Sequence, residues 1–392
     1  MSESANSTVT LNGARNLGVG ALVVGGAFCV TGMLTNDNEK FLASYLFAYV
    51  LWMALTLGCL GLQLLLHTVR GSWGAAVVRI YEAGGGPLSF IGMAFAFVPI
   101  ALNMDTLYHH WMHPAKGDMI LAHKAAWLNE PAFLIRTGIY FAIWFGLAAF
   151  MRASTLAQEK SGNSNEISRR NNLAAPGLVL FVVSVTFAIT DWVMSLDPHW
   201  FSTIFGVWYL VSGVLGALAL GAIIVCRNAK AEPYRGIISP QLTKDLGNLM
   251  LAFTMFWCYV SLSQFIIIWS GNLPEFITYY KNRGTFEWTM FGAFNIFVGF
   301  FVPFLLLLFP RTKAVAQVLL PVAALLFAMR FSDMYYHVIP AMRSTLFNVW
   351  DLAALVGVGG VWTLMFGIQI RQAPLVPNYD TRLVEAKAKH AH

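Results

Sequence analysis

Long runs of apolar residues, separated by short polar segments, recur along almost the whole chain. Within each run the apolar residues are continuous, whereas the strands of a membrane β-barrel alternate between apolar and polar positions. A helix needs about 20 mostly apolar residues to cross the hydrocarbon core of a bilayer, and each run offers that length. The pattern predicts an all-α integral membrane protein with about ten transmembrane helices, near residues 17–34, 42–67, 87–108, 131–151, 173–195, 203–226, 247–270, 287–309, 313–336 and 349–371.

The composition supports this prediction and excludes a water-soluble globule. Of 392 residues, 57% are hydrophobic and 11% are charged, whereas ordinary soluble domains have roughly 25% charged residues. The net charge of +6 does not indicate a nucleic acid partner, because the Lys and Arg residues lie mostly between the apolar runs. Four cysteines lie inside apolar runs without a CxxC motif and are interpreted as small buried hydrophobic residues: Cys29, Cys59, Cys226 and Cys258.

Lys and Arg are unevenly distributed between the two sides that ten crossings define. Seventeen fall in segments on the side of the termini, and six fall on the other side. Cytoplasmic loops of membrane proteins are enriched in Lys and Arg, so both termini are predicted to be cytoplasmic. The chain then divides into a cytoplasmic segment 1–16, a membrane domain 17–371 and a cytoplasmic tail 372–392, which we expect to be unstructured without a partner.

Two of the predicted cytoplasmic connections have a sequence that suggests a conformation. Residues 153–172 are polar and lack aromatic side chains, which predicts a mobile linker. In residues 70–82, Trp73, Val77 and Ile80 recur at the spacing of one helix face, which favours a helix lying flat at the membrane surface over a plain loop. Neither segment is predicted to cross the bilayer.

The few ionisable residues inside or at the ends of the apolar runs are candidate sites, because a charge at the centre of a membrane helix costs about 2.5–3.5 kcal/mol. Two positions share the pattern Asp-x-x-Tyr-His, from Asp105 to His109 and from Asp333 to His337. Residues four apart lie on one face of a helix, so each Asp is expected to stack against its His. The fifth run adds a third carboxyl group, Asp191.

Carboxyl and imidazole groups in series can pass protons, because each can take up and release one. These groups lie towards the predicted outer side of the membrane. We therefore expect a proton route to the outer aqueous phase, with these candidates: Asp105, His109, Asp191, Arg330, Asp333, Tyr336 and His337. The alternative is a structural role, in which Arg330 and Asp333 neutralise each other and Asp105 is hydrated near the interface.

The histidines do not predict a haem or a metal bound by this chain. A haem b pair needs two histidines that face each other within the membrane. His67 lies at one end of its run, and six others lie at or beyond the opposite ends of theirs. The cluster of His109, His110, His113 and His123 lacks a thiolate or carboxylate framework, so contacts with water or another subunit are expected.

The motifs of the sequence bear on two other classes of function. The sequence has no P-loop, no dinucleotide-binding glycine motif and no HExxH, so nucleotide hydrolysis and proteolysis are not expected. A secondary transporter is an alternative that predicts broken helices at corresponding positions of two halves. The prolines inside the runs, Pro99, Pro303 and Pro321, do not correspond in this way.

Two segments, Thr190 to Val207 and Phe253 to Glu275, resemble the F subunit of bacterial alternative complex III, a quinol:electron acceptor oxidoreductase with membrane subunits of the NrfD type. The resemblance covers most of the membrane region and is sharpest over residues 173–340. It implies two four-helix bundles, formed by the second to fifth and the sixth to ninth spans, flanked by the first and last spans. The polar segment 153–172 would then lie inside the first bundle instead of separating two groups of helices.

The same resemblance implies a non-catalytic subunit that carries no haem or iron–sulfur cluster of its own. Quinol would be oxidised in a related C subunit, and electrons would leave through iron–sulfur and haem c subunits on the outer side. This chain would support assembly and proton translocation among the lipids of the bacterial inner (cell) membrane. An alternative is that the chain itself holds a quinone between its bundles.

Overall fold

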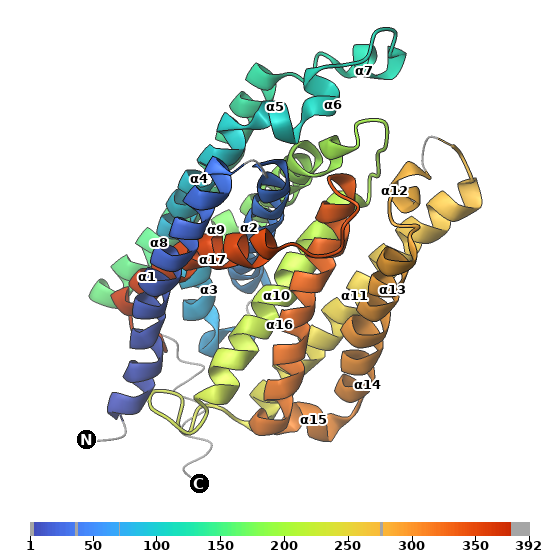
Figure 1. Cartoon of the computed structure of the whole chain (residues 1–392). Coiled ribbons are helices and arrows are strands. Elements are labelled where there is room, and N and C mark those ends of the chain that lie inside the picture. Colours follow the sequence, from blue (N-terminus) through green and yellow to red (C-terminus); the bar gives the residue numbers. More distant parts are fainter. Residues whose placement is uncertain (1–3, 36–37, 70, 275–276, 378–392) are drawn as a thin grey trace.

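Every regular element in the part of the chain that the structure describes is a helix (Figure 1). The computed structural model describes residues 4–35, 38–69, 71–274 and 277–377. Ten helical stretches in these ranges are long and apolar enough to cross a membrane, which confirms the prediction of a multi-pass, all-α membrane protein. They are formed by α1 (Ser4–Leu34), α2 (Asn38–Val69), α3 with α4 (Val78–Gly84 and Pro87–Leu102), α8 (Glu130–Ser161), α9 (Asn165–Trp192), α10 (Phe205–Arg227), α11 (Pro240–Gly271), α13 with α14 (Phe286–Ile296 and Val302–Leu308), α16 (Ala316–Val338) and α17 (Val349–Gln369).

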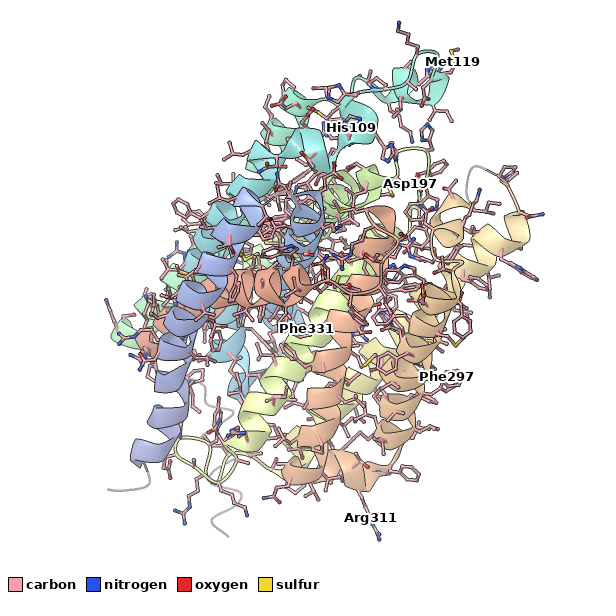
Figure 2. All side chains as sticks on the ribbon, viewed as in Figure 1. His109, Met119, Asp197, Phe297, Arg311 and Phe331 are labelled. Carbon is pink, nitrogen blue, oxygen red and sulfur yellow. The ribbon has the colours of Figure 1, made fainter. Side chains whose placement is uncertain are left out.

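Short helices connect the spans at the two ends of the molecule. They are α5 (Met104–Leu107), α6 (His109–Met112), α7 (Met119–Lys124), α12 (Thr278–Lys281) and α15 (Pro310–Ala314). Helices α5 to α7 project beyond the bundles at one end, and α15 lies at the other (Figure 1). Met119 and Arg311 mark these ends in Figure 2. We refer to them as the α7 end and the α15 end.

The ten spans form two four-helix bundles with two flanking helices, the arrangement that the resemblance implies. Helices α2, α4, α8 and α9 pack together as the first bundle, and α10, α11, α13 with α14, and α16 form the second. The bundles meet where α10 packs against α2 and α9. Helices α1 and α17 pack against each other, and α17 packs against α2. Helix α2 is therefore surrounded by helices and is buried over most of its length.

Glycines allow the closest helix crossings, as is typical of helix packing in membranes. A Cβ atom added to Gly58 of α2 would lie 2.1 Å from the carbonyl oxygen of Gly213 in α10. A Cβ atom added to Gly25 of α1 would lie 2.3 Å from the backbone nitrogen of Gly357 in α17. No larger residue fits at Gly25 or Gly58 without moving the helices apart.

The prediction of a mobile linker over residues 153–172 is wrong, because this segment is helical. Helix α8 continues to Ser161, Gly162 turns the chain with φ 66°, and α9 begins at Asn165. The polar side chains pair between the two helices: Ser154 Oγ donates to Glu166 Oε2 at 2.6 Å, and Arg170 donates to Ser154 Oγ at 3.1 Å. The buried polar side chains of this segment thus pair between helices of the first bundle, and residues 160–165 around the turn are exposed to solvent.

The segment from residue 70 to 82 is helical where it is described, but it does not lie on the surface of the protein. A 3₁₀ helix, η1 (Ser72–Ala76), leads into α3, and Val77 and Ile80 are fully buried. Helix α3 packs against α2 and α17. Of the predicted terminal segments, residues 1–3 and 378–392 lie outside the described ranges, and α1 begins at Ser4, before the predicted start of the membrane domain.

Candidate functional site

Asp191 is the centre of a buried polar site in the first bundle. It lies near the C-terminal end of α9 and is inaccessible to solvent. Arg136 of α8 donates from Nε to Oδ2 at 2.8 Å and from Nη2 to Oδ1 at 3.0 Å. The Tyr140 hydroxyl donates to Oδ2 at 2.8 Å, and the Trp127 indole donates to Oδ1 at 2.9 Å. Each carboxylate oxygen thus accepts two hydrogen bonds, which fills its two lone-pair directions.

Asp333 is the centre of a second buried site, on α16 in the second bundle. Its Oδ2 atom accepts hydrogen bonds from Ser212 Oγ at 2.7 Å, Trp257 Nε1 at 3.0 Å and Arg330 Nη1 at 3.1 Å. Its Oδ1 atom lies 3.5 Å from His337 Nε2. The predicted contacts of Asp333 with Arg330 and with His337, one helical turn away on either side, are both present.

His337 connects the Asp333 site to the α7 end of the molecule. Its Nδ1 atom hydrogen-bonds to the hydroxyl of Tyr279 in α12, and the Tyr279 ring stacks on Trp200 at 4.3 Å. Burial raises the pKa of the Tyr279 hydroxyl well above its ordinary value, so this group keeps its proton and can donate it in a hydrogen bond. Asp333, His337 and Tyr279 therefore form a chain of polar contacts directed towards the α7 end.

Arg283 fixes the position of this chain of contacts. Its guanidinium donates to the backbone carbonyls of Tyr279 at 2.6 Å, His337 at 2.8 Å and Tyr336 at 3.0 Å. The same guanidinium lies 3.5 Å from the centre of the Tyr279 ring. Helix α12 is thereby tied to the C-terminal end of α16.

The ring of the candidate Tyr336 contacts the His337 ring at 5.5 Å between centroids, but its hydroxyl is directed away from Asp333. Its hydroxyl lies against α13, where a Cβ atom added to Gly292 would be 3.1 Å away. Its ring also contacts Trp288, at 6.4 Å between centroids. The structure brings together Arg330, Asp333 and His337, with Tyr336 directed towards a different helix.

The predicted stacking of Asp105 on His109 is wrong. Helix α4 ends at Leu102, and the chain continues as α5 and α6 with a break at Tyr108 between them. The break removes the four-residue spacing of a continuous helix, and Asp105 Oδ1 instead lies 2.5 Å from His113 Nε2. Both Asp105 and His109 are exposed, so they belong to the surface of the α7 end and not to a buried site.

The loop between α9 and α10 is tied to α7 by two polar contacts. His199 Nε2 lies 2.7 Å from Asp118 Oδ2, and Lys124 Nζ donates to the Pro198 carbonyl at 2.6 Å. The hydrogen bond from the Leu121 backbone N–H holds the pKa of Asp118 below its ordinary value, and His199 adds to this effect. Partial burial lowers the pKa of the Lys124 ammonium.

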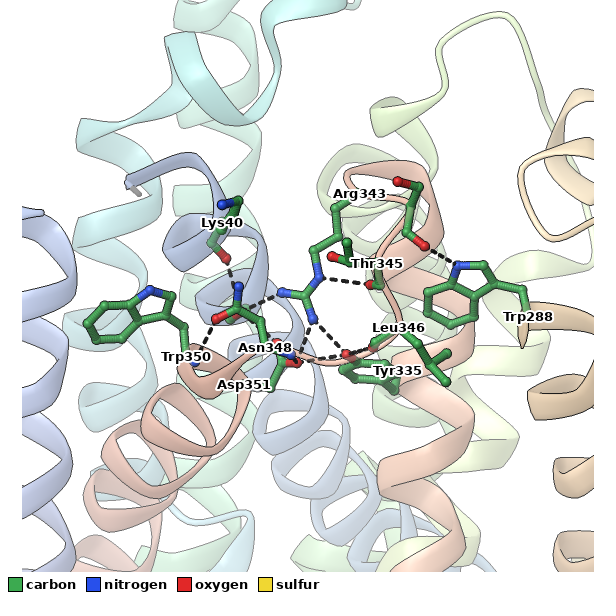
Figure 3. A network of polar contacts seen from close by, with 11 residues as sticks. Lys40, Trp288, Tyr335, Arg343, Thr345, Leu346, Asn348, Trp350 and Asp351 are labelled. Carbon is green, nitrogen blue, oxygen red and sulfur yellow. Dashed lines mark hydrogen bonds and ion pairs between the residues drawn. The ribbon is translucent and has the colours of Figure 1, made fainter. Parts of the chain in front are cut away.

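Sequence reasoning missed a third buried carboxylate, Asp351, at the start of α17 (Figure 3). It forms an ion pair with Arg343 and accepts hydrogen bonds from Ser44 Oγ at 2.6 Å and the Tyr335 hydroxyl at 2.7 Å. Its side chain also accepts from the Asn348 backbone N–H at 2.8 Å and so caps the helix. The sequence did contain a signal, because Asn348 is followed three residues later by an acidic residue, a pattern that is typical of the start of a helix.

A fourth buried carboxylate, Glu82, lies nearer the α15 end, in the segment for which the sequence predicted a helix flat at the membrane surface. The Glu82 carboxylate accepts hydrogen bonds from Arg79 Nη1 at 2.6 Å, Arg152 Nη1 at 3.1 Å and Thr155 Oγ1 at 2.9 Å. Arg79 also forms an ion pair with Glu159. The signal in the sequence was the spacing of Arg152, Thr155 and Glu159, which places them on one helix face.

Helix α8 supplies partners to both Asp191 and Glu82. Arg136 and Tyr140 reach the first, and Arg152 and Thr155 reach the second. Between them, Trp144 donates to Ser184 Oγ at 2.9 Å, and the residues that follow on the buried face are apolar: Leu147, Ala148 and Met151. From Trp144 to Arg152 the helix rises about 12 Å. On this face of α8 the partners of Asp191 and of Glu82 are thus separated by an apolar segment.

Sequence reasoning also missed Arg136, the main partner of Asp191. Its signal was present, because it is a basic residue inside the apolar run 131–151. Within the described ranges, no three or more His, Cys, Asp or Glu side chains gather as metal ligands would. No protein-family model and no curated protein matches this sequence.

Proposed function

We propose that this chain is a membrane subunit of a respiratory quinol:electron acceptor oxidoreductase, without a redox centre of its own, which supports assembly and proton translocation. The observation that carries the proposal is the placement of Asp191 and Asp333. Each is a buried carboxylate on the last helix of one four-helix bundle, and each is held by an arginine and a tryptophan. The resemblance of residues 190–207 and 253–275 to the F subunit of alternative complex III supplies the type of complex.

A contribution to helix packing does not by itself explain why the protein has buried ion pairs at these two positions. Buried ion pairs can often be replaced by apolar residues of similar volume at no loss of stability. Ionisable groups inside membrane domains are typical of proton and ion pathways. The repetition of the same arrangement in both bundles therefore favours a role in moving protons over a role in packing.

In the second bundle, a series of polar contacts leads from the buried Asp333 towards the α7 end. Asp333, His337 and Tyr279 are in contact in that order, and Tyr279 lies in the short helix α12 at the α7 end. An imidazole can accept a proton on one nitrogen and release one from the other. A proton received at Asp333 could leave through His337 and Tyr279.

The first bundle offers carboxylates at two depths. Asp191 lies towards the α7 end and Glu82 towards the α15 end, with the apolar segment of α8 between their partners. A dry segment blocks proton passage until water or a moving side chain bridges it. Such a barrier would let the complex couple proton movement to quinol oxidation.

The proposed orientation places the α15 end in the cytoplasm of a bacterial cell. Lys and Arg are enriched in the connections at this end, in accordance with the positive-inside rule. Protons from the Asp333 chain would then be released on the outer side. The partners would be a quinol-binding C subunit of the NrfD type and iron–sulfur and haem c subunits on that side.

The proposal is tested by purifying the tagged chain from its native membranes in a mild detergent. We expect haem c and iron–sulfur subunits to co-purify in a fixed ratio, with quinol oxidation activity in the same fraction. A tagged multi-pass protein of unrelated function serves as the control for nonspecific association. A chain that purifies alone and moves a solute into proteoliposomes would instead support a secondary transporter.

A further inference from the structure

Two lysines and an arginine gather where α15 packs against the start of α11. Arg311 and Lys313 belong to α15, and Lys244 lies near the start of α11. The Thr243 hydroxyl donates to the Ala314 carbonyl at 3.0 Å. This bond holds their sequence neighbours, Lys244 and Lys313, close together. We refer to Lys244, Arg311 and Lys313 as the basic corner.

The side chain of Lys313 lies on a glycine of α11. A Cβ atom added to Gly247 would be 2.6 Å from Lys313 Cγ and 3.1 Å from its Cδ, so the lysine stem lies directly on the helix backbone. Gly247 comes three residues after Lys244, and residues at this spacing are neighbours on a helix surface. Lys244 and Lys313 therefore occupy neighbouring positions on one face of α11.

The basic corner has no acidic partner in the part of the chain that the structure describes. The sequence from Val302 to Ser332, which covers α14, α15 and most of α16, contains no Asp or Glu. Helix α11 has one acid, Asp245, which lies about 200° around the helix from Gly247. Its carboxylate accepts a hydrogen bond from Gln241 Nε2 at 2.8 Å. Three positive charges are thus left for an anion from outside the chain.

Exposed apolar side chains border α15 on both sides along the chain. Leu308 and Phe309 precede it, and Val315 and Val318 follow it. Leu308 and Val318 belong to α14 and α16, which are membrane spans. Arg311 marks this end of the molecule in Figure 2. The basic corner therefore lies where the hydrocarbon core of a bilayer would meet the headgroup region.

The start of α16 adds to the positive potential of the basic corner. This helix begins at Ala316, two residues after the end of α15, and no side chain caps it. The N-terminal end of a helix carries a partial positive charge that favours an anion nearby. An anion held by Lys313 would also be close to this helix end.

We propose that the basic corner binds the headgroup of an anionic phospholipid. The ammonium groups of Lys244 and Lys313 would contact its phosphate, and its acyl chains would cover the exposed apolar side chains of α14 and α16. Basic pockets between membrane helices bind such headgroups. A soluble phosphate would leave the apolar side chains uncovered, and a zwitterionic headgroup would bring a further positive charge to three others. The site does not depend on the proposed respiratory role.

The test is native mass spectrometry of the full-length chain in detergent, with added phosphatidylglycerol or phosphatidylcholine of the same acyl chains. We expect the wild type to bind the first phosphatidylglycerol at least about tenfold more tightly than phosphatidylcholine, because two cations contribute to the difference. The double variant Lys244→Gln, Lys313→Gln should lose this preference and keep its binding of phosphatidylcholine. Thermal unfolding shows that each variant is folded.

Two further variants distinguish a defined site from the general positive charge of the protein. The double variant Lys160→Gln, Arg169→Gln removes two positive charges from exposed positions around the turn between α8 and α9. It should keep the preference for phosphatidylglycerol. Gly247→Val leaves the net charge unchanged but displaces the stem of Lys313, so it should reduce the preference.

Three results would overturn the proposal. Equal preference in the wild type and in the folded Lys244→Gln, Lys313→Gln variant would place the lipid elsewhere. An equal loss in the Lys160→Gln, Arg169→Gln variant would show an effect of net charge alone. Displacement of phosphatidylglycerol by an equal concentration of glycerol phosphate would assign the basic corner to a soluble phosphate. None of these results depends on whether the chain co-purifies with redox subunits, so the proposed function is tested separately.

Discussion

Arg136 and Asp191, 55 residues apart in the sequence, form a two-point ion pair between α8 and α9, with N···O distances of 2.8 Å and 3.0 Å. The guanidinium also lies 4.0 Å from the centre of the Trp127 ring. Since the carboxylate is inaccessible to solvent, water cannot replace any of its partners. The pair therefore fixes the packing of α8 on α9 and keeps a charge inside the first bundle.

Replacing Asp191 by alanine should destabilise the protein by about 3–5 kcal/mol, because it leaves the Arg136 charge without its partner. Thermal unfolding in detergent measures the change. The double variant Arg136→Met, Asp191→Leu should regain part of this loss, since an apolar pair leaves no buried charge unpaired. Asp105→Asn is the control and should have little effect, because that side chain is 71% exposed. This account would be contradicted if the double variant lost as much stability as the single variants Arg136→Met and Asp191→Leu lose together.

Gly25 and Gly26 provide an adjacent pair for testing the contact of α1 with α17. Gly25→Leu should destabilise this contact by about 1–3 kcal/mol, because its side chain would overlap the backbone of α17. The lower melting temperature and faster proteolysis of α1 report the change. Gly26→Leu should be tolerated, since a Cβ atom there has no neighbour within 4 Å. Equal effects of the two substitutions would argue against the close packing of α1 on α17.

The cap that Asp118 provides for α7 should depend on pH. Its carboxylate accepts from the Leu121 backbone N–H at 3.0 Å, and this bond and His199 hold the pKa of Asp118 below its unfolded value. A folded pKa below the unfolded pKa means that the stabilisation is present above about pH 4 and is lost as the pH falls further. Amide hydrogen exchange of residues 119–124, corrected for the intrinsic rate, should therefore lose protection in acid.

Asp118→Asn is the control for this effect. Its amide oxygen can still accept from the Leu121 N–H but does not titrate in this range. Protection of α7 should then be the same on both sides of pH 4. The same acid-dependent loss in wild type and variant would assign the effect to another group.

The ten spans followed from the sequence because hydrophobic length alone defines a crossing. The contacts of Asp333 also followed, since Arg330 and His337 lie one turn away on the same helix. Pairs between helices could not be predicted in this way. Arg136 and Asp191 meet only because α8 packs on α9, and a single sequence contains no signal for which faces meet.

Two predictions are wrong, one at a polar segment and one at a helix break. Residues 153–172 include the ends of two helices: Ser154, Glu166 and Arg170 pair with one another between these helices, while residues 160–165 around the turn are exposed to solvent. The helix break at Tyr108 moved Asp105 away from His109. That break is stabilised by a distant contact, the hydrogen bond from the buried Tyr108 hydroxyl to the Trp192 carbonyl at 3.0 Å.

The most direct test of the proposed proton role is the number of protons released per quinol oxidised by the intact complex in proteoliposomes. Asp333→Asn removes the charge that His337 and Arg330 contact while keeping the shape of the side chain. The account predicts fewer protons per quinol in this variant, with the complex assembled and electron transfer retained, and no change in Asp105→Asn. An assembled Asp333→Asn complex that releases as many protons per quinol as the wild type would contradict it.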